Sequence, residues 1–447
     1  MYILTNGRLI TRDPDARGYY EKGAVVYEGS KIVEVGEEAA LTAKYPQAEK
    51  IDAKGGVIMP ALINAHTHIY SALARGLSIV GNNPTNFLEV LDGTWWAIDR
   101  HLTLEGTRAS ADALYIDCIK QGVTTVFDHH ASYCQIPGSL FQIGESAKKF
   151  GIRSCLCYEV SDRDGEEKCL EAIRENADWI TYCREHNDPM LAAMFGGHAL
   201  FTISDKTFDR MVEANNGRTG YHIHVSEGMN DVYDSLQNYG RRPVQRLQDH
   251  GILGEKTILG HCIHVNTAEM ELIRETGTMV VNNPESNMGN AIGICPVIQL
   301  YKRGILLGMG TDAYTNDMLE SLKVALCSQR SQNCLPNVGW CEVTDMLFKN
   351  NAKIGEKYFP DTLGVLKAGA AADIIVMDYK PFTPFSDENI DGHMIFGMTG
   401  RQCQTTIAAG KLLMKDRELV GIDEEAENAH ILEASRKLWG TLNHREY

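Results

Sequence analysis

The sequence predicts an α/β protein made of a (β/α)8 TIM barrel and a small β-sandwich domain formed from both chain ends. Two observations support this fold class. Across the middle of the chain, eight short apolar segments alternate with longer segments of helical period, which is the pattern of a parallel barrel. At both ends, short strand-like runs surround glycine turns, so the two ends can pair with each other.

The length of 447 residues suits a large domain of about 300 residues together with a smaller one. The sandwich is expected to take residues 1–57 and 363–447, the latter including a helix over about 425–442, and the barrel to take residues 58–362. Strands of the sandwich are expected at 2–5, 24–27, 31–35, 371–377 and 405–413.

The barrel strands are identified as short apolar runs that alternate with helical segments. We expect these strands at 57–64, 123–128, 152–158, 191–198, 220–225, 257–261, 278–282 and 305–310, and helices at 106–120, 166–184, 204–215, 267–275 and 296–303. A doubly wound sheet is the alternative. It lacks support, because no Gly-x-Gly-x-x-Gly segment follows the first strand.

Composition excludes several other classes of protein. The formal net charge of −16 repels nucleic acids and anionic lipid surfaces. No run of about 18 apolar residues and no signal peptide is found, and the 12 cysteines form no Cys-x2-Cys pair. We therefore expect a cytoplasmic protein with reduced thiols that acts on a small molecule rather than on nucleic acid or a membrane.

Chemistry-bearing residues stand where the predicted strands end, which is where barrels of this class place their active sites. These residues are His66 and His68 after the first strand, His198 at the fourth, His222, His224 and Glu227 at the fifth, His261 at the sixth and Asp312 at the eighth. The sequence therefore predicts a single site at this end of the barrel.

A metal site is the first interpretation of this set. His66 and His68 are two apart on a strand and so share a face. With His224 and the carboxylate of Asp312 they offer three imidazoles and one oxygen ligand, which suits one divalent metal ion, Zn²⁺ or Fe²⁺. The alternative is a group of histidines that cap strands or form hydrogen bonds in the core.

The same residues indicate a reaction. A metal ion at such a site lowers the pKa of its bound water and supplies hydroxide at neutral pH, and Asp312 can accept the proton. Glu227, three residues beyond His224, can deliver a proton to a ring nitrogen. This favours an aminohydrolase that releases ammonia from an aminated heterocycle or related C=N compound. The alternatives are a hydrolase that opens a cyclic amide or expels another leaving group such as chloride, and a silent scaffold, which would lack a ligand.

The loops after the strands are expected to bind the substrate. Trp95 and Trp96 can stack on a flat ring, and His129 follows the second strand. Glu285 can pair with a cationic or donor-bearing group such as a guanidine, amidine or aminopurine. Packing or hydrogen bonds within the loops are the alternative explanation for each of these residues, and also for Glu159 and Asp162 after the third strand.

Several motifs together resemble the amidohydrolase superfamily, in the branch of guanine deaminase, methylthioadenosine/S-adenosylhomocysteine deaminase and the triazine hydrolases. The motifs are residues 60–68, 222–227, 260–262, 283–288, 310–312 and 363–373. As a whole the chain is most similar to the selenium-metabolism-associated aminohydrolases.

This resemblance implies roles for single residues. His66, His68, His224 and Asp312 would bind the metal, Glu227 would shuttle protons, and His198 would approach the substrate. His261 would form a hydrogen bond to the metal-bound water or approach the metal itself. The fourth strand has no lysine that could bridge two metals, so one metal is expected. A dimer or tetramer is implied as well.

Overall fold

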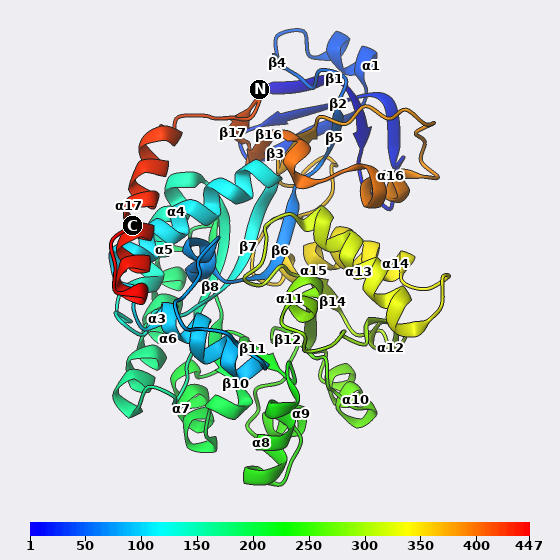
Figure 1. Cartoon of the computed structure of the whole chain (residues 1–447). Helices are drawn as coiled ribbons and strands as arrows, with labels where there is room; N and C mark the ends of the chain where they lie inside the picture. The colour runs from blue at the N-terminus through cyan, green and yellow to red at the C-terminus, as the bar shows by residue number, and fades with distance from the viewer.

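The computed structural model describes residues 1–447, and the middle of the chain forms a closed barrel of parallel strands (Figure 1). One sheet contains β6 (Leu62–Thr67), β7 (Val123–His130), β8 (Arg153–Tyr158) and β9 (Leu191–Ala193). The other contains β10 (Phe195–Ala199), β11 (Tyr221–Val225), β12 (Ile258–His261), β13 (Met279–Asn282) and β14 (Leu307–Met309). Two parallel bridges, Val160 to Gly197 and Thr67 to Asp312, join the sheets and close the barrel. The predicted eight-stranded fold is confirmed.

The fourth barrel strand is broken in two, where the sequence predicts one strand over 191–198. Met194 separates β9 from β10. A side chain at Gly196 would place its Cβ 2.2 Å from the Tyr158 carbonyl oxygen, so only glycine allows the two chains this close. Both halves stay in the barrel, because β9 pairs with β8 and β10 pairs with β11. His198 lies near the end of β10.

The two chain ends form a nine-stranded sheet (Figure 1). The N-terminal part supplies β1 (Tyr2–Ile10), β2 (Tyr19–Glu28), β3 (Lys31–Glu37), β4 (Glu49–Asp52) and β5 (Val57–Pro60). The C-terminal part supplies β15 (Ile374–Met377), β16 (Cys403–Ala408), β17 (Lys411–Lys415) and β18 (Glu418–Leu419). The two parts join where β5 pairs with β15 in antiparallel fashion. The strands form one continuous sheet that surrounds a core of 14 buried residues.

The sheet contains the first half of the segment that the sequence assigns to one barrel strand over 57–64. Residues 57–60 are β5 of the terminal sheet, and the barrel begins at Leu62. All four side chains of β5 are buried, as are all six of β6. Because both strands are buried, their hydrophobic patterns are alike, and a boundary after residue 57 falls within the terminal sheet.

Helices cover the outside of the barrel (Figure 1). They are α4 (Leu104–Gln121), α5 (Ser139–Phe150), α6 (Glu166–His186), α7 (Asp205–Asn215), α8 (Met229–Tyr239), α9 (Pro243–Asp249), α10 (Thr267–Glu275), α12 (Val297–Lys302) and α13 (Met318–Asn333). The short helices α2 (Phe87–Val90) and α3 (Trp96–Asp99) lie in the connection after β6, and α11 (Pro284–Gly289) follows β13. The C-terminal helix α17 (Glu424–Asn443) packs against α4. The connections that follow β6 and β13 thus contain short helices.

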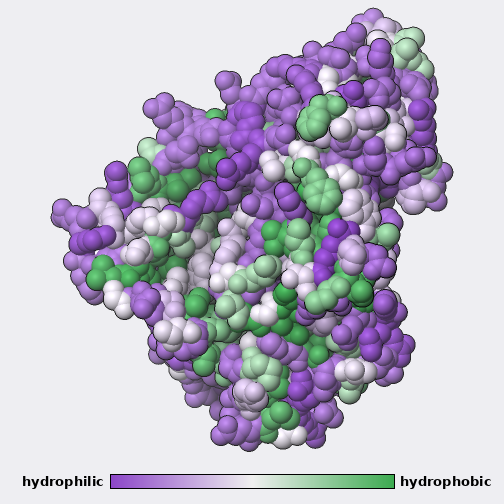
Figure 2. Space-filling model, turned by 45° about the vertical axis from the view of Figure 1, so that its right-hand side comes forward, coloured by the Kyte–Doolittle hydropathy of each residue, from purple (hydrophilic) through white to green (hydrophobic).

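One face of the molecule is uneven in hydropathy (Figure 2). The end that carries the terminal sheet is mostly hydrophilic there, whereas hydrophobic residues gather toward the middle and the opposite end. None of the helices has the length and apolar character needed to cross a membrane.

A buried ion pair fastens the terminal sheet to the barrel, and its loss should be costly. Arg153 of β8 is fully buried and pairs with Asp373, next to β15, and with Asp361 at 3.3 Å. Arg153→Ala leaves Asp373 buried without its cation, so we expect the free energy of unfolding to fall by about 3–5 kcal/mol. Thermal unfolding measures the change. Lys437→Ala breaks only exposed pairs, with Glu105 and Glu433, and should hardly move the midpoint; equal shifts would contradict the assignment.

Candidate active site

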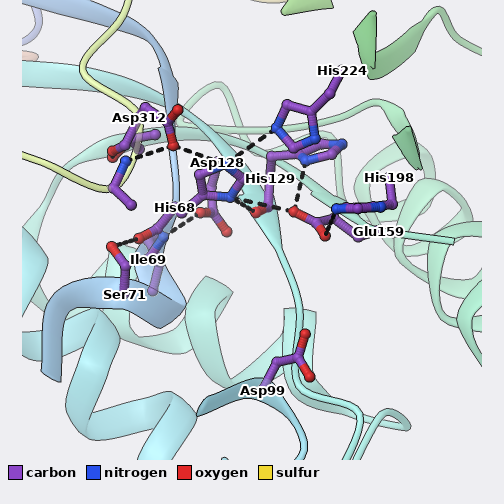
Figure 3. A network of polar contacts seen from close by, with 12 residues as sticks. His68, Ile69, Ser71, Asp99, Asp128, His129, Glu159, His198, His224 and Asp312 are labelled. Carbon is purple, nitrogen blue, oxygen red and sulfur yellow. Dashed lines mark hydrogen bonds and ion pairs between the residues drawn. The ribbon is translucent and has the colours of Figure 1, made fainter. Parts of the chain in front are cut away.

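Side chains from four strand ends converge at the mouth of the barrel. His68 Nε2 lies 3.2 Å from His224 Nε2 and 3.2 Å from Asp312 Oδ1, and His261 Nε2 lies 3.5 Å from Asp312 Oδ2. The ring of His66 is centred 4.9 Å from that of His68 and 5.2 Å from that of His224. All five residues are buried. Figure 3 shows His68, His224 and Asp312 directed toward one another.

Tight backbone contacts hold the first and last strands together at this point. The N–H groups of Thr311 and Asp312 both donate to the His66 carbonyl oxygen at 3.0 Å. Asp312 and His261 have φ values of 56° and 69°, in the left-handed region that is uncommon for residues other than glycine. Such strain is concentrated at functional sites, where the surrounding structure enforces it.

The nitrogen and oxygen atoms at the centre fit a bound cation. His68 Nδ1 donates to the His129 carbonyl oxygen, which leaves Nε2 to face His224 and Asp312. His66 Nε2 is buried and has no hydrogen-bond partner. Burial lowers the pKa of His68, but the Asp312 carboxylate outweighs burial and raises it to about 9. The site therefore favours positive charge at this point, and its imidazole and carboxylate atoms are of the kind that bind Zn²⁺ or Fe²⁺.

Neighbouring polar residues orient the central ones. His66 Nδ1 lies 2.8 Å from His222 Nε2, and the Ser286 hydroxyl donates to Asp312 Oδ2 at 2.6 Å. His261 Nδ1 lies 2.7 Å from Asn287 Oδ1, while the amide nitrogen of Asn287 donates to Asn282. Asn287 thus accepts a hydrogen bond from His261 Nδ1, so that His261 Nε2 carries the lone pair, with the Asn283 amide nitrogen 3.5 Å away from it. Such partners are as important to a metal site as its ligands.

Sequence reasoning gives no role to Ser286 or Asn287, although it includes both in the motif over 283–288. It also leaves the role of His222 open. The only indication of a role for these residues in the sequence is their position near the ends of strands that also carry predicted metal ligands and catalytic residues. Which way each side chain of α11 points depends on how the helix is seated.

Glu227, the residue expected to shuttle protons, lies beside this centre. Its Oε1 is 3.7 Å from His261 Nε2, and its side chain is 13% exposed. Burial, and then repulsion from Asp312, raise the pKa of Glu227 well above its usual value. For Asp312, burial acts in the same direction, but His68 and Ser286 outweigh it and lower the pKa. The pKa values of the two carboxyl groups are thus shifted in opposite directions, which is the pattern seen where one carboxyl group serves as an acid and another as a base.

The predicted substrate residues are distributed unevenly around this centre. The ring of Trp96 is centred 5.8 Å from that of His198, and the Arg163 guanidinium lies 5.0 Å from its centroid. Trp95 instead packs edge-on against Tyr70 at 6.4 Å and lines a cavity of about 140 Å³ that Asp312 also lines. Burial lowers the pKa of His198 to about 3, so that its ring is neutral.

His129 lies beneath the centre, without a nitrogen free for a substrate. Its ring is fully buried, with Nδ1 3.0 Å from Glu159 Oε1 and Nε2 3.0 Å from the His222 carbonyl oxygen (Figure 3). Direct substrate binding by His129, expected from the sequence, does not fit this arrangement. The side chain points into the barrel interior, where both nitrogens find partners within the protein.

Glu285 is directed toward α13 rather than into the histidine cluster. Its carboxylate accepts a hydrogen bond from the Ser321 hydroxyl at 3.3 Å. Burial, and then the nearby Glu320 and Asp317 carboxylates, raise the pKa of Glu285 to about 7. Its neighbour Ser286 is the residue of α11 that turns toward Asp312. The contact of Glu285 with substrate, expected from the sequence, stays a prediction.

From the raised pKa of Glu285 we predict that this residue lowers the stability of the folded protein at high pH. An acid whose pKa is higher in the folded state destabilises the fold once pH rises from its unfolded value near 4.5 through 7. Glu285→Gln should thus stabilise the protein by about 2–3 kcal/mol at pH 8 and by almost nothing at pH 4. Unfolding midpoints at both pH values measure this. An equal change in stability at both pH values would contradict the raised pKa of Glu285. A lower kcat/KM in the variant would support its role in substrate binding.

Comparisons with known proteins agree with this arrangement. The profile of the amidohydrolase family matches residues 57–413, and that of a bacterial imidazolonepropionase-like composite domain matches residues 23–48. The chain is 30% identical to a 5'-deoxyadenosine deaminase of Methanosarcina mazei over 99% of both chains. It is 31% identical to a 5-methylthioadenosine/S-adenosylhomocysteine deaminase of Thermococcus sibiricus, over 88% of this chain and 90% of that one.

A solved structure with the same fold carries zinc. It is an adenosine deaminase from Xanthomonas campestris with bound zinc, with a TM-score of 0.86 and 22% identity over 98% of each chain. The family profile spans all the barrel strands and part of the terminal sheet, and the two relatives named above cover 99% and 88% of this chain. The chain therefore belongs to the amidohydrolase family.

Proposed function

We propose that this protein is a metal-dependent aminohydrolase that releases ammonia from an aminated heterocycle, with one Zn²⁺ per chain bound by His66, His68, His224 and Asp312. The observation that carries the proposal is the carboxyl group of Glu227, 3.7 Å from His261 Nε2, beside this group of convergent nitrogen and oxygen atoms. Burial raises the pKa of this carboxyl group. The relatives that are named deaminases support the same reaction class. Fe²⁺ could fill the same donor set.

The residues divide the work of the reaction between them. When bound, the metal lowers the pKa of a water molecule and makes hydroxide available at neutral pH. The ionised Asp312 accepts the proton of that water, and His261, fixed by Asn287, accepts a hydrogen bond from it at Nε2. Glu227 donates its proton to the ring nitrogen next to the reacting carbon and so makes that carbon a better electrophile. The hydroxide would then add to that carbon, so that a C–O bond forms. The amino group would take the proton held by Asp312 and leave as ammonia as the C–N bond breaks, and the proton of the added hydroxyl group would return to Glu227.

A hydrolase that opens a cyclic amide or expels chloride could use the same metal. Opening a cyclic amide has less need of an acid beside the metal, because polarising a carbonyl group is enough for amide hydrolysis. The position of Glu227 therefore favours deamination over amide opening. Expulsion of chloride from a heterocycle would use the same acid, so the products distinguish that reaction.

Ammonia release by zinc-loaded protein tests the proposal. The panel holds aminopurines and their nucleosides, aminopyrimidines, pterins, guanidines and amidines, together with cyclic amides and a chlorotriazine whose products are followed separately. Ammonia from at least one amino compound supports the proposal. Ring opening or chloride release without ammonia across the panel would overturn it in favour of the alternative.

A homo-oligomer and a cytoplasmic location, both expected from the sequence, stay predictions. Light scattering on the purified protein measures the first, and fractionation of cells measures the second.

A further inference from the structure

A buried carboxylate at the end of the third barrel strand has a free oxygen atom. Glu159 follows β8, and its side chain is 2% exposed. Its Oε1 lies within hydrogen-bonding distance of His129 Nδ1, at 3.0 Å, and 3.4 Å from His68 Nδ1. Its Oε2 accepts no hydrogen bond from the protein, and the polar atom that faces it is His198 Nε2 at 3.9 Å. The residue is buried, but Oε2 is not one of the fully enclosed side-chain atoms that lack a partner, so a donor that enters the site can reach it.

His198 places a second acceptor next to this oxygen. Its Nδ1 lies 2.8 Å from the Thr202 hydroxyl oxygen, and that hydroxyl lies 2.9 Å from the Ala199 carbonyl oxygen. Both hydrogen bonds form only if Thr202 donates to Ala199 and His198 donates from Nδ1. In the neutral ring, Nε2 is then an acceptor. Figure 3 shows the side chains of Glu159 and His198 facing each other. With this tautomer, Glu159 Oε2 and His198 Nε2, 3.9 Å apart, are two adjacent acceptors to which no protein group donates.

The nearest cation does not serve this pair. Arg163 is occupied by the carboxylates of Asp99 and Asp164 and by the faces of Tyr133 and Trp96, which lie 4.1 and 5.0 Å from its guanidinium. Trp96 also stands against His198, at 5.8 Å between ring centroids. An aromatic face and two acceptors therefore adjoin one another at the edge of the centre.

We propose that Glu159 is a specificity-determining residue whose Oε2, together with His198 Nε2, binds a pair of hydrogen-bond donors on the substrate. This inference rests on the proposed function, since it concerns the substrate of the same site. It predicts a substrate that presents two N–H or O–H groups on the side away from the reacting carbon. Two sources offer such groups: the amino and N–H edge of a heterocycle, and the adjacent hydroxyls of a nucleoside sugar.

A second cation at His129 and Glu159 is the competing explanation, because His68, His129, Glu159 and His224 also lie close enough together to hold one. Hydrogen bonding disfavours it. Both nitrogens of His129 are engaged, and His68 Nδ1 donates to a carbonyl oxygen. A metal ion at this point would have to break these contacts.

The test uses Glu159→Gln, which keeps the size of the side chain and an acceptor for His129 but turns an amide donor toward His198. Two pairs of compounds are compared on zinc-loaded protein: adenosine with 2',3'-dideoxyadenosine, and 2,6-diaminopurine with adenine. Dissociation constants come from calorimetry, and kcat/KM comes from ammonia release wherever turnover occurs. Glu166→Gln, the same change at an exposed residue seven positions on, is the matched control.

In wild type we expect one pair to show discrimination in favour of the compound with donors, and this pair identifies the source. Glu159→Gln should lower the affinity for that compound about 10–100-fold and leave its partner within about 2-fold, with unchanged metal content and melting temperature. Glu166→Gln should change neither. Because binding is measured directly, this result stands even if no ammonia is released, which would count against the proposed function alone.

Three results would overturn the inference. The first is wild-type protein that does not discriminate within either pair. The second is an equal loss for both members of a pair in Glu159→Gln, which would indicate a purely structural role. The third is two metal ions per wild-type chain and one in the variant, which would assign Glu159 to a second cation.

Discussion

Glu227→Gln should lower kcat for ammonia release by about 10²–10⁴-fold, the usual contribution of a general acid. The amide has nearly the same size as the carboxyl group, so the packing next to His261 and Asp312 is preserved, but it has no acidic proton to give to a ring nitrogen. The raised pKa of Glu227 shows that burial and Asp312 keep that proton in place. Steady-state ammonia release at saturating substrate measures the effect.

Three readouts separate this role from a structural one. Metal content and melting temperature should match those of wild type, and KM should change by less than about 3-fold, since the lost interaction operates in the transition state. Glu227→Asp, which keeps an acid but withdraws it, should have intermediate activity. A Glu227→Gln enzyme that retains full kcat would refute the assigned proton transfer.

Metal removal should abolish activity, by more than about 10³-fold, because a catalytic metal supplies several kcal/mol and each 1.4 kcal/mol or so is a factor of ten. Zn²⁺ should restore the activity of chelator-treated protein. Mg²⁺ should not, since it prefers oxygen ligands in octahedral geometry, whereas three of the four proposed ligands are imidazoles. His224→Ala should lower the bound zinc well below one per chain.

Stability gives this prediction an independent readout. A ligand that binds only the folded state stabilises it by about 2.7 kcal/mol at a hundredfold excess over Kd, so the melting temperature of the apo protein should rise with zinc concentration. In His224→Ala the rise should be much smaller. If chelated protein kept its activity, or if zinc left the melting temperature unchanged, these residues would not form the metal site.

The sequence was most informative about the strand ends. His66 and His68 share a strand face at the start of the barrel, and His224, His261 and Asp312 each end a later strand, so a correct strand order was sufficient to bring them together. Parallel strands of one barrel place their ends at a common rim. The prediction of this convergence therefore needed no knowledge of side-chain positions.

What the sequence could not give was orientation. Glu285 and Ser286 are neighbours on α11, yet one contacts Ser321 and the other Asp312. His129 follows a strand as His198 does, but its nitrogens are both used within the protein. These differences depend on how a helix is seated or how deep a ring lies, and residue type does not record either. The division of residues 57–64 between two sheets could not be predicted either, because both halves of the segment are equally apolar.

The antiparallel pairing of β5 with β15 has a consequence for how the protein folds. Ile374 pairs with Pro60, about 310 positions earlier in the chain, and contacts between such distant residues slow folding. During synthesis, which proceeds N-terminal end first, β1 to β5 emerge long before the partner of β5 exists. The edge of β5 that pairs with β15 therefore stays exposed until almost the whole barrel has been synthesised. Its apolar side chains and open hydrogen-bonding edge are features that favour aggregation, so the yield of folded protein should depend on chaperones that shield this segment during translation.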